Sequence, residues 1–318
     1  MRKGTKLALV AAFMLLFAFS AGAGAYDLKW GTSPVGGLWG VLGNAMLEDV
    51  LKVNPSIKGS TVPIGGSANV IGVSENKLNI AFSFSDSVND AWEGREPFQA
   101  KGKMRNIRVL AALFPEPTQF AVYADSGITS IPQLKGKKMT PGPKGSAIEI
   151  VTRRILAEYG LTYKDMQVQL IGFEDGAQLM IDNHLDAILY GAMVLPAPTL
   201  VNINSQRQIR LLPLTDDVVN KLVAKYKGLE PWTIQPGTYK GVDYPVKGVA
   251  AQVVLVVRED MPDDVAYTVT KAVAENFERY KGVAKAMSMA KQRDMGKEVG
   301  VAYHAGAVKY YKEKGWLK

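Results

Sequence analysis

The chain has 318 residues, of which 47% are hydrophobic and 21% charged, with a formal net charge of +8 and no cysteine. This length suits two domains, and the lack of cysteine excludes disulfides, thiol catalysis and thiolate metal sites. The basic residues are scattered rather than clustered, so the charge indicates a solvated surface and argues against nucleic-acid binding.

The first 25 residues have the layout of a secretory signal peptide. A basic start precedes an apolar run, 7–19, and small residues follow up to Ala25. We expect cleavage after Ala25, with Ala23 as the alternative site, and a periplasmic mature protein. A membrane anchor is the other interpretation, but the apolar run is shorter than the roughly 20 residues that a span needs.

The chain then repeats one pattern three times, a strand followed by a turn and a helix. We expect the strands at 26–30, 57–62 and 78–84, each followed by small or polar residues where a helix begins. Repeats of this kind are typical of parallel strands joined by crossover helices. The sequence therefore predicts an α/β fold.

A second α/β unit follows an apolar stretch that contains two prolines. We expect a strand at 107–114, a break at Pro115-Glu116-Pro117, and extended structure again at 119–124. The elements expected after it are a helical turn at 131–136, strands at 137–140, 168–171, 187–190 and 249–257, a loop at 231–241, and helices at 148–159, 177–183, 216–227, 262–280 and 305–314. The C-terminal helices are expected to complete the first unit.

Four helix starts, three in the first unit and one in the second, are built from Gly, Ser, Thr and Asp. In open α/β sheets, ligands bind where strand ends meet such helix starts, and the free N–H groups there favour an anion. One such turn could be ordinary loop sequence, so the repetition carries the argument. The candidate donors are Thr32, Ser33, Gly37, Ser67, Asn69 and Ser146, with a positive charge from Lys144 and Ser67 expected as an N-cap.

Two carboxylates lie close to these predicted turns. Asp86 begins the third helix, where it is either an N-cap or a partner for an ammonium or hydroxyl group of a ligand. Glu116 lies between two prolines, and a lone carboxylate does not make an acid/base pair. We therefore expect a structural role for Glu116 at a junction between lobes.

The sequence offers little support for catalysis. His184 lies in a polar turn and is expected to be exposed, and His304 precedes a helix and is expected to make structural hydrogen bonds. Neither histidine has the spacing of a metal ligand, and no Gly-x-Ser-x-Gly motif occurs. We expect no catalytic residue, metal or cofactor, and hence a protein that is not an enzyme.

Taken in order, the motifs of the chain resemble those of the TAXI family. TAXI stands for the TRAP-associated extracytoplasmic immunogenic type, the solute-binding proteins of tripartite ATP-independent periplasmic (TRAP) transporters. The resemblance covers essentially the whole mature chain. The motifs that carry it are Gly31-Thr32 with Gly36-Gly37, Gly65-Gly66-Ser67 with Asn69, Asp86, Leu113-Phe114-Pro115-Glu116, Asp125-Ser126-Gly127-Ile128, Leu134-Lys135-Gly136-Lys137, Gly145-Ser146, Asp186-Ala187, Pro236-Gly237-Thr238-Tyr239 and Gly306-Ala307.

The resemblance implies a periplasmic-binding-protein-like fold of type II, with two lobes joined by two hinge crossings. We accordingly expect residues 1–25 as the signal peptide, 26–122 and 249–318 as lobe 1, and 123–248 as lobe 2. The implied function is capture of a small organic anion between the lobes, a dicarboxylate, 2-oxo acid or amino acid such as 2-oxoglutarate or glutamate. The implied partners are membrane-embedded TRAP transporter subunits, and the protein is expected to be a monomer that binds no nucleic acid.

The resemblance also implies where the ligand binds. Matching motifs place ligand contacts at Thr32, Ser67, Asp86, Ser146 and Gly191. The neighbours that complete the expected site are Ser33, Gly37, Leu38, Trp39, Ala68, Asn69, Ser85, Lys144, Gly145, Ala147 and Tyr190.

The chain departs from the family pattern near this site. Leu38-Trp39 stands where the family often has two aromatic residues, Ala147-Ile148 replaces Gly-Thr, and 192–198 is unusually apolar. These differences suit a carboxylate less polar than glutamate. Two alternatives stay open: a binding protein for an ABC importer or a sensor kinase, and, less favoured, a periplasmic enzyme on the same fold.

Overall fold

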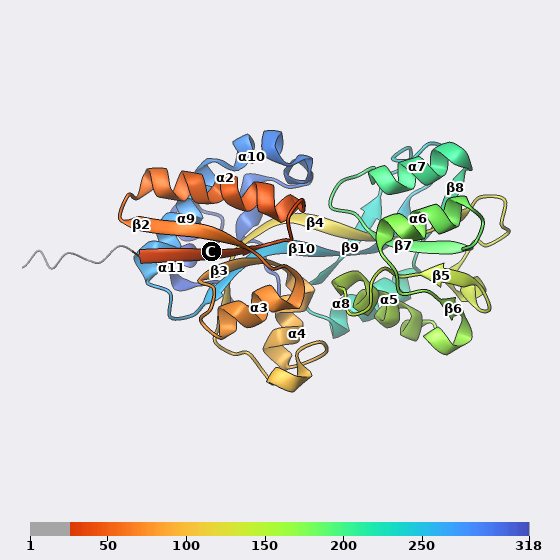
Figure 1. The fold of residues 1–318 in the computed structure, drawn as a ribbon, viewed down its shortest axis with the longest axis horizontal. Coiled ribbons are helices and arrows are strands. Elements are labelled where there is room, and N and C mark those ends of the chain that lie inside the picture. The colour runs from red at the N-terminus through yellow and green to blue at the C-terminus, as the bar shows by residue number, and fades with distance from the viewer. Residues whose placement is uncertain (1–25, 318) are drawn as a thin grey trace, which may run out of the picture.

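The computed structural model describes residues 26–317, so the predicted signal peptide lies outside the described residues. It shows two lobes that share one mixed sheet (Figure 1). The strands are β1 (Tyr26–Thr32), β2 (Ile57–Pro63), β3 (Ile80–Phe84), β4 (Ile107–Tyr123), β5 (Lys138–Thr140), β6 (Gln167–Val168), β7 (Ala187–Gly191), β8 (Ile209–Leu212), β9 (Leu229–Ile234) and β10 (Val246–Arg258). The helices are α2 (Leu38–Val53), α3 (Gly66–Ser74), α4 (Ser85–Glu93), α5 (Ala147–Glu158), α6 (Phe173–Ile181), α7 (Pro198–Gln206), α8 (Asp216–Lys225), α9 (Asp263–Glu275), α10 (Phe277–Val283) and α11 (Ala305–Glu313).

The sheet order explains how two lobes share two strands. The order is β2-β1-β3-β10-β4-β7-β5-β6, with β8 paired to β4 and β9 paired to β10. We call β1–β3, α2–α4 and α9–α11 lobe 1, and β5–β9 with α5–α8 lobe 2. The long strands β4 and β10 pair antiparallel with each other and run from one lobe into the other (Figure 1). They are the two crossings that the sequence predicts, although the residue boundaries of the lobes stay a prediction.

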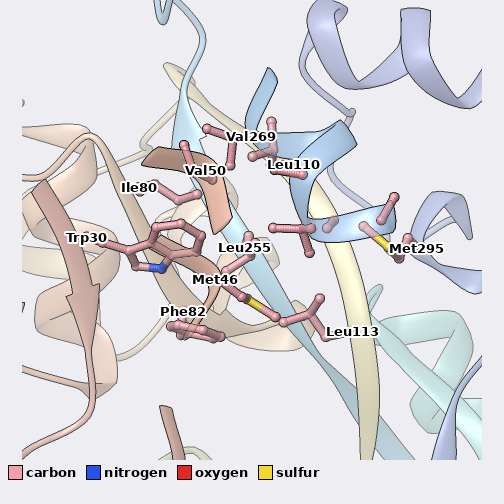
Figure 2. Close-up of a cluster of buried hydrophobic side chains, with 14 of the residues drawn as sticks. Trp30, Met46, Val50, Ile80, Phe82, Leu110, Leu113, Leu255, Val269 and Met295 are labelled. Carbon is pink, nitrogen blue, oxygen red and sulfur yellow. The ribbon is translucent and has the colours of Figure 1, made fainter. Parts of the chain in front are cut away.

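The main hydrophobic core belongs to lobe 1 and forms between the sheet and its helices. Figure 2 shows Trp30 of β1 and Leu255 of β10 beside Met46 and Val50 of α2 and Val269 of α9. Because apolar residues at spacings of three and four share one face of a helix, the stripe in α2 points into this core. The α9 helix packs there too, and α11 packs on α9, which confirms that the C-terminal helices complete lobe 1.

One hydrophobic core of lobe 2 is built around α5, and a second one involves α6 and α7. The α5 side chains Ile148, Val151 and Ile155 are buried against residues of β4 and β7, as their helical spacing predicts. The α5 helix also packs against α8, and these contacts hold α5 and with it one wall of the junction between lobes.

The expected break at the two prolines is wrong, because β4 continues through them. Pro115, Glu116 and Pro117 pair with Gln252, Ala251 and Ala250 of β10, whereas the pairing of β4 with β7 begins only at Thr118. Each proline lacks an N–H group, but here the strand has a partner on one side only. Prolines are therefore tolerated at the point where β4 crosses between lobes.

Two other expectations need correction. The expected loop 231–241 starts with strand β9, which pairs with β10 from Leu229 to Ile234. The expected single helix 262–280 is divided into α9 and α10 at Asn276, whose side-chain amide donates to the carbonyl of Ala272. A side-chain bond of this kind competes with the helical backbone pattern. Over residues 26–317, no helix is long and apolar enough to cross a bilayer.

Candidate functional site

A small cavity lies between the lobes where four helix starts meet. Its volume is about 40 Å³, which is room for a few water molecules and far less than the roughly 300–1,000 Å³ of a typical ligand pocket. The lobes are therefore closed over it, and this form leaves less room than a typical solute needs. The lining residues are Trp39 of α2, Gly66 and Ser67 of α3, Ser83 and Phe84 of β3, Asp86, Ser87 and Asp90 of α4, Pro97, and Gly145, Ala147 and Ile150 at the start of α5.

The start of α3 is shaped by a glycine and a buried asparagine. Gly65 is the N-cap, with a φ of +84° that suits glycine, so the expectation that Ser67 is the N-cap is wrong. Asn69 is fully buried, accepts a hydrogen bond from the Gly65 N–H, and donates to the carbonyls of Thr32 and Phe82. It thereby joins α3 to the ends of β1 and β3, which places Ser67 on the cavity wall.

The start of α5 has the cap that its sequence predicts. The Ser146 hydroxyl accepts from the N–H of Glu149 at 3.3 Å, and the Gly145 N–H donates to the Glu149 carboxylate at 3.1 Å. Because its hydroxyl is used by the cap, Ser146 shapes the helix start rather than lining the cavity. Lys144 is exposed beside it.

Asp86 lies in the first turn of α4, with Phe84 as the N-cap, so the N-cap interpretation of Asp86 is wrong. Its side chain is buried, 2% exposed, at the cavity wall. Its Oδ1 makes no hydrogen bond to any of residues 26–317, although the backbone N–H groups of Ser87 and of Asp86 itself act on the carboxylate. Burial raises its pKa to about 6, although Arg154 lowers it and Asp90 raises it further.

Arg154 of α5 reaches from lobe 2 to the acids of lobe 1. Its Nη2 donates to Asp90 Oδ2 at 2.6 Å, its Nη1 lies 3.8 Å from Asp86 Oδ2, and its guanidinium covers the ring of Tyr226. Arg95 binds the other oxygen of Asp90 at 2.8 Å. Within the described part of the chain, Arg154 Nη1 is buried and has no hydrogen-bond acceptor. We call Asp86 Oδ1 and Arg154 Nη1 the open pair.

A second acid, Glu116 of β4, lies at the same junction. Its carboxyl group lies against Gly191 of β7, where a side-chain carbon would come within 3.0 Å of it. Burial, with the nearby charge of Asp86 as the smaller cause, raises the pKa of Glu116 to about 8. Gly191 therefore leaves room for this acid, and the predicted role of Glu116 at a lobe junction agrees with its place in β4.

An aromatic group forms the lobe 1 side of the cavity. Trp39 stacks on Phe82 with ring centroids 5.7 Å apart and lies 5.1 Å from Phe84. Its indole Nε1 is buried and has no acceptor within residues 26–317. Trp39 thus adds an apolar face and one donor to the wall.

Further polar contacts join the two lobes. Beside α4 and α5, Arg153 makes two hydrogen bonds to Glu96, at 2.8 and 2.9 Å. The Ser85 hydroxyl donates to the Gly228 carbonyl, and Lys297 pairs with Glu230 at 2.5 Å. Ser85 therefore helps to hold the junction together, and its expected contact with a ligand stays a prediction.

The structure brings part of the predicted site together. The predicted residues on the cavity wall are Trp39, Ser67, Asp86, Gly145 and Ala147. Those that do not line it in this closed form are Thr32, Ser33, Gly37, Leu38, Ala68, Asn69, Ser85, Lys144, Ser146, Tyr190 and Gly191. Their contact with a ligand stays a prediction.

Sequence reasoning missed several wall residues, and above all the charges behind the wall. Asp90 is four residues after Asp86 in one helix, so the two share a face. Ala147, Ile150 and Arg154 are likewise spaced by three and four along α5. Helical spacing from the predicted contacts would therefore have found both Asp90 and Arg154. Pro97 and Ser83 carry no such signal.

The two histidines take the places expected of them. His184 is exposed, and His304 caps α11 by accepting from the Gly306 N–H. In the described range 26–317, no group of three or more His, Asp or Glu side chains is arranged to hold a metal ion.

Comparison with known proteins identifies the fold and the family. The chain resembles the periplasmic aliphatic sulphonate binding protein SsuA of Escherichia coli, with a TM-score of 0.51 and 15% identity over 91% of this chain and 83% of that one. It resembles a TctC solute binding protein from Polaromonas, with a TM-score of 0.54 and 15% identity over 92% and 99%. It also resembles a chain from work on glutathione import through GshT and the cystine ABC importer TcyBC of Streptococcus mutans, with a TM-score of 0.51 and 11% identity over 85% and 99%.

Such low identities show a shared fold and leave the ligand open. They support the predicted α/β fold with two lobes and two crossings. The family follows from a different comparison, in which residues 30–315 match the model of the NMT1-like family. Because this match covers nearly all of the described residues, the chain belongs to the NMT1-like family.

Proposed function

We propose that this protein is an extracytoplasmic solute receptor that captures a small organic acid between its lobes and releases it to a membrane transporter. The observation that carries the proposal is the open pair. It consists of an unsatisfied acceptor of Asp86, which lines the interlobe cavity, and an unsatisfied donor of Arg154, which lies next to Asp86 but is not itself a lining residue. Buried polar groups are nearly always paired, and an unpaired one costs about 1–3 kcal/mol. A solute that pairs with both atoms would stabilise the closed form.

Of the three expected ligand classes, the amino acid fits this arrangement best. An ionised dicarboxylate or 2-oxo acid supplies hydrogen-bond acceptors for Arg154. Neither of these ligands supplies a hydrogen-bond donor for the Asp86 carboxylate. An amino acid carries a carboxylate and an ammonium group on one carbon and so can pair with both. Asp86 would then be the partner for a ligand ammonium group, as one interpretation of the sequence has it.

The membrane partner we propose is a TRAP-type transporter, and this part rests on the motifs shared with TAXI proteins. An ABC importer is the alternative partner, favoured by the likeness to the chain studied with the importer TcyBC. We further propose that the protein binds its solute without converting it, after export by its predicted signal peptide.

The test is thermal unfolding of ligand-stripped protein, residues 26–318, against L-amino acids, 2-oxo acids and dicarboxylates. A ligand at 100 times its Kd stabilises by about 2.7 kcal/mol, which raises the midpoint measurably. We expect a hit among the amino acids, with affinity reduced about 10- to 100-fold in Asp86→Asn because a charged hydrogen bond is lost. The proposal would be contradicted if no compound of the panel raised the unfolding midpoint, or if Asp86→Asn bound the ligand as tightly as wild type.

A further inference from the structure

We propose that Arg154 reads the carboxylate of the ligand from lobe 2, so that recognising the ligand's charge and closing the lobes are one event. This inference rests on the proposed function and adds a residue from outside the expected site. The two hydrogen-bonding ends of the guanidinium group have different tasks: Nη2 holds Asp90 of lobe 1, and Nη1 binds the solute.

The place of Arg154 in the fold supports this division. The Arg154 side chain is 9% exposed, and its guanidinium group packs on the ring of Tyr226. Arg154 follows the cavity residue Ile150 by one turn of α5. Its position is thereby fixed before a ligand arrives, which reduces the entropy lost on binding. The contact of Nη2 with Asp90 aims the remaining end at Asp86, a residue of the cavity wall.

The hydrogen bonds around Arg154 are incomplete without a ligand. Asp90 is bound on one oxygen by Arg95 and on the other by Arg154, so its two oxygens are both used. The Asp86 carboxylate lies 3.8 Å from Nη1, which is too long for a hydrogen bond, and otherwise it has the backbone N–H groups of Ser87 and of Asp86 itself beside it. A carboxylate between the lobes would give Nη1 an acceptor, and a donor next to it would give one to Asp86.

The adjacent residue provides a matched control. Arg153 also crosses from α5 to lobe 1, but its Nε donates to Glu149 and both terminal nitrogens donate to Glu96. Neither arginine lines the cavity, but Arg154 contacts two lining residues, Asp86 and Asp90, whereas the partners of Arg153 do not line it. A residue that only holds the lobes together should affect every ligand equally, whereas one that reads a carboxylate should affect acids more than their amides.

The experiment measures the Kd of each carboxylic acid in the panel beside that of its carboxamide, for wild type, Arg154→Gln and Arg153→Gln. We expect wild type to bind the best acid at least about 30-fold more tightly than its amide, as for a charged hydrogen bond. Arg154→Gln should reduce this ratio to about threefold or less, because the variant binds the acid more weakly. Arg153→Gln should leave the ratio unchanged, while the affinities for both compounds fall together.

A second variant guards against misfolding of Arg154→Gln. Arg154→Lys keeps the positive charge but lacks the planar guanidinium group that can bind Asp90 and a ligand at the same time. We therefore expect its ratio of acid to amide affinity to lie between those of wild type and Arg154→Gln. A ratio unchanged in both Arg154 variants, or an amide that binds wild type as well as its acid does, would overturn this inference and leave the receptor function standing. Failure of every carboxylic acid to bind wild type would overturn both.

Discussion

Two neighbouring arginines of α5 cross from lobe 2 to lobe 1, and they end in different surroundings. Arg153 is 36% exposed and has hydrogen-bond partners at all three of its side-chain nitrogens. Arg154 is buried, and one of its terminal nitrogens belongs to the open pair. The first contact is complete as it stands, and the second is completed by a ligand.

This difference separates an arginine that only holds the two lobes together from one that recognises the ligand. A half-exposed ion pair contributes about 0.2–1 kcal/mol, so the Arg153 contact adjusts how easily the lobes open. A buried charge without a full set of partners is costly, and a ligand that supplies the partners recovers that cost. The protein therefore has a weak contact between the lobes at Arg153. Beside it, at Arg154, lies a stronger contact in which one donor still lacks a partner.

The largest expected effect comes from replacing Asp86. The replacement should raise the stability of the ligand-free protein and lower its affinity for the ligand. Because burial raises the pKa of Asp86 to about 6, its charge destabilises the closed, ligand-free protein above that pH. Asp86→Asn should therefore stabilise the ligand-free protein at pH 8 by about 2 kcal/mol, although it weakens ligand binding. Denaturant unfolding of wild type and variant checks the sign, and a less stable variant would contradict the account.

The next effect is a pH dependence that comes from Glu116. Its pKa is raised to about 8 by burial, so the native protein binds a proton there that the unfolded chain releases near pH 4.5. The stability contribution is greatest below pH 4.5 and is lost as the pH rises towards 8, by about 1–2 kcal/mol once its partial exposure is allowed for. Asp86 acts in the same direction, but its effect ends near pH 6.

Thermal midpoints of wild type and Glu116→Gln between pH 6 and 8.5 isolate this effect. The wild-type midpoint should fall with pH over this range, and the fall should be smaller in the variant. Parallel curves would show that Glu116 is ionised and hydrated in solution.

The smallest effect belongs to the exposed contact. Arg153→Gln and Glu96→Gln should each cost less than about 1 kcal/mol, and their double-mutant cycle should give a coupling of about 0.2–1 kcal/mol that shrinks in high salt. A coupling above 2 kcal/mol would make Arg153 as important to closure as Arg154 and would remove the difference on which the comparison rests.

The sequence predicts the fold well because its signals are local. Alternating strands, apolar helix faces such as 42, 46 and 50, and glycine-rich turns placed the four helix starts that meet at the cavity. The continuous β4 was missed, since tolerance of Pro115 and Pro117 depends on which neighbours a strand has. The division at Asn276 was missed as well, because the pattern of apolar residues does not show the side-chain hydrogen bond that Asn276 makes to the backbone there.

The candidate site was predicted only in part, for a physical reason. Contacts that follow directly from a helix start, such as Ser67, Asp86 and Ala147, were within reach of motif reasoning. Arg154 and Asp90 are separated by 64 positions, and nothing local indicates that they meet. Their pairing arises from closure of two lobes, which a turn motif does not describe.

The most direct test of the central claim is calorimetry of the ligand-stripped protein at pH 6, in buffers of different ionisation enthalpy. Each L-amino acid that binds is compared with its matched 2-oxo acid. The account predicts that the amino acid binds at least about tenfold more tightly. It also predicts release of about half a proton, because a ligand ammonium group beside Asp86 lowers a pKa near 6. Equal or tighter binding of the 2-oxo acid, with proton uptake, would contradict it.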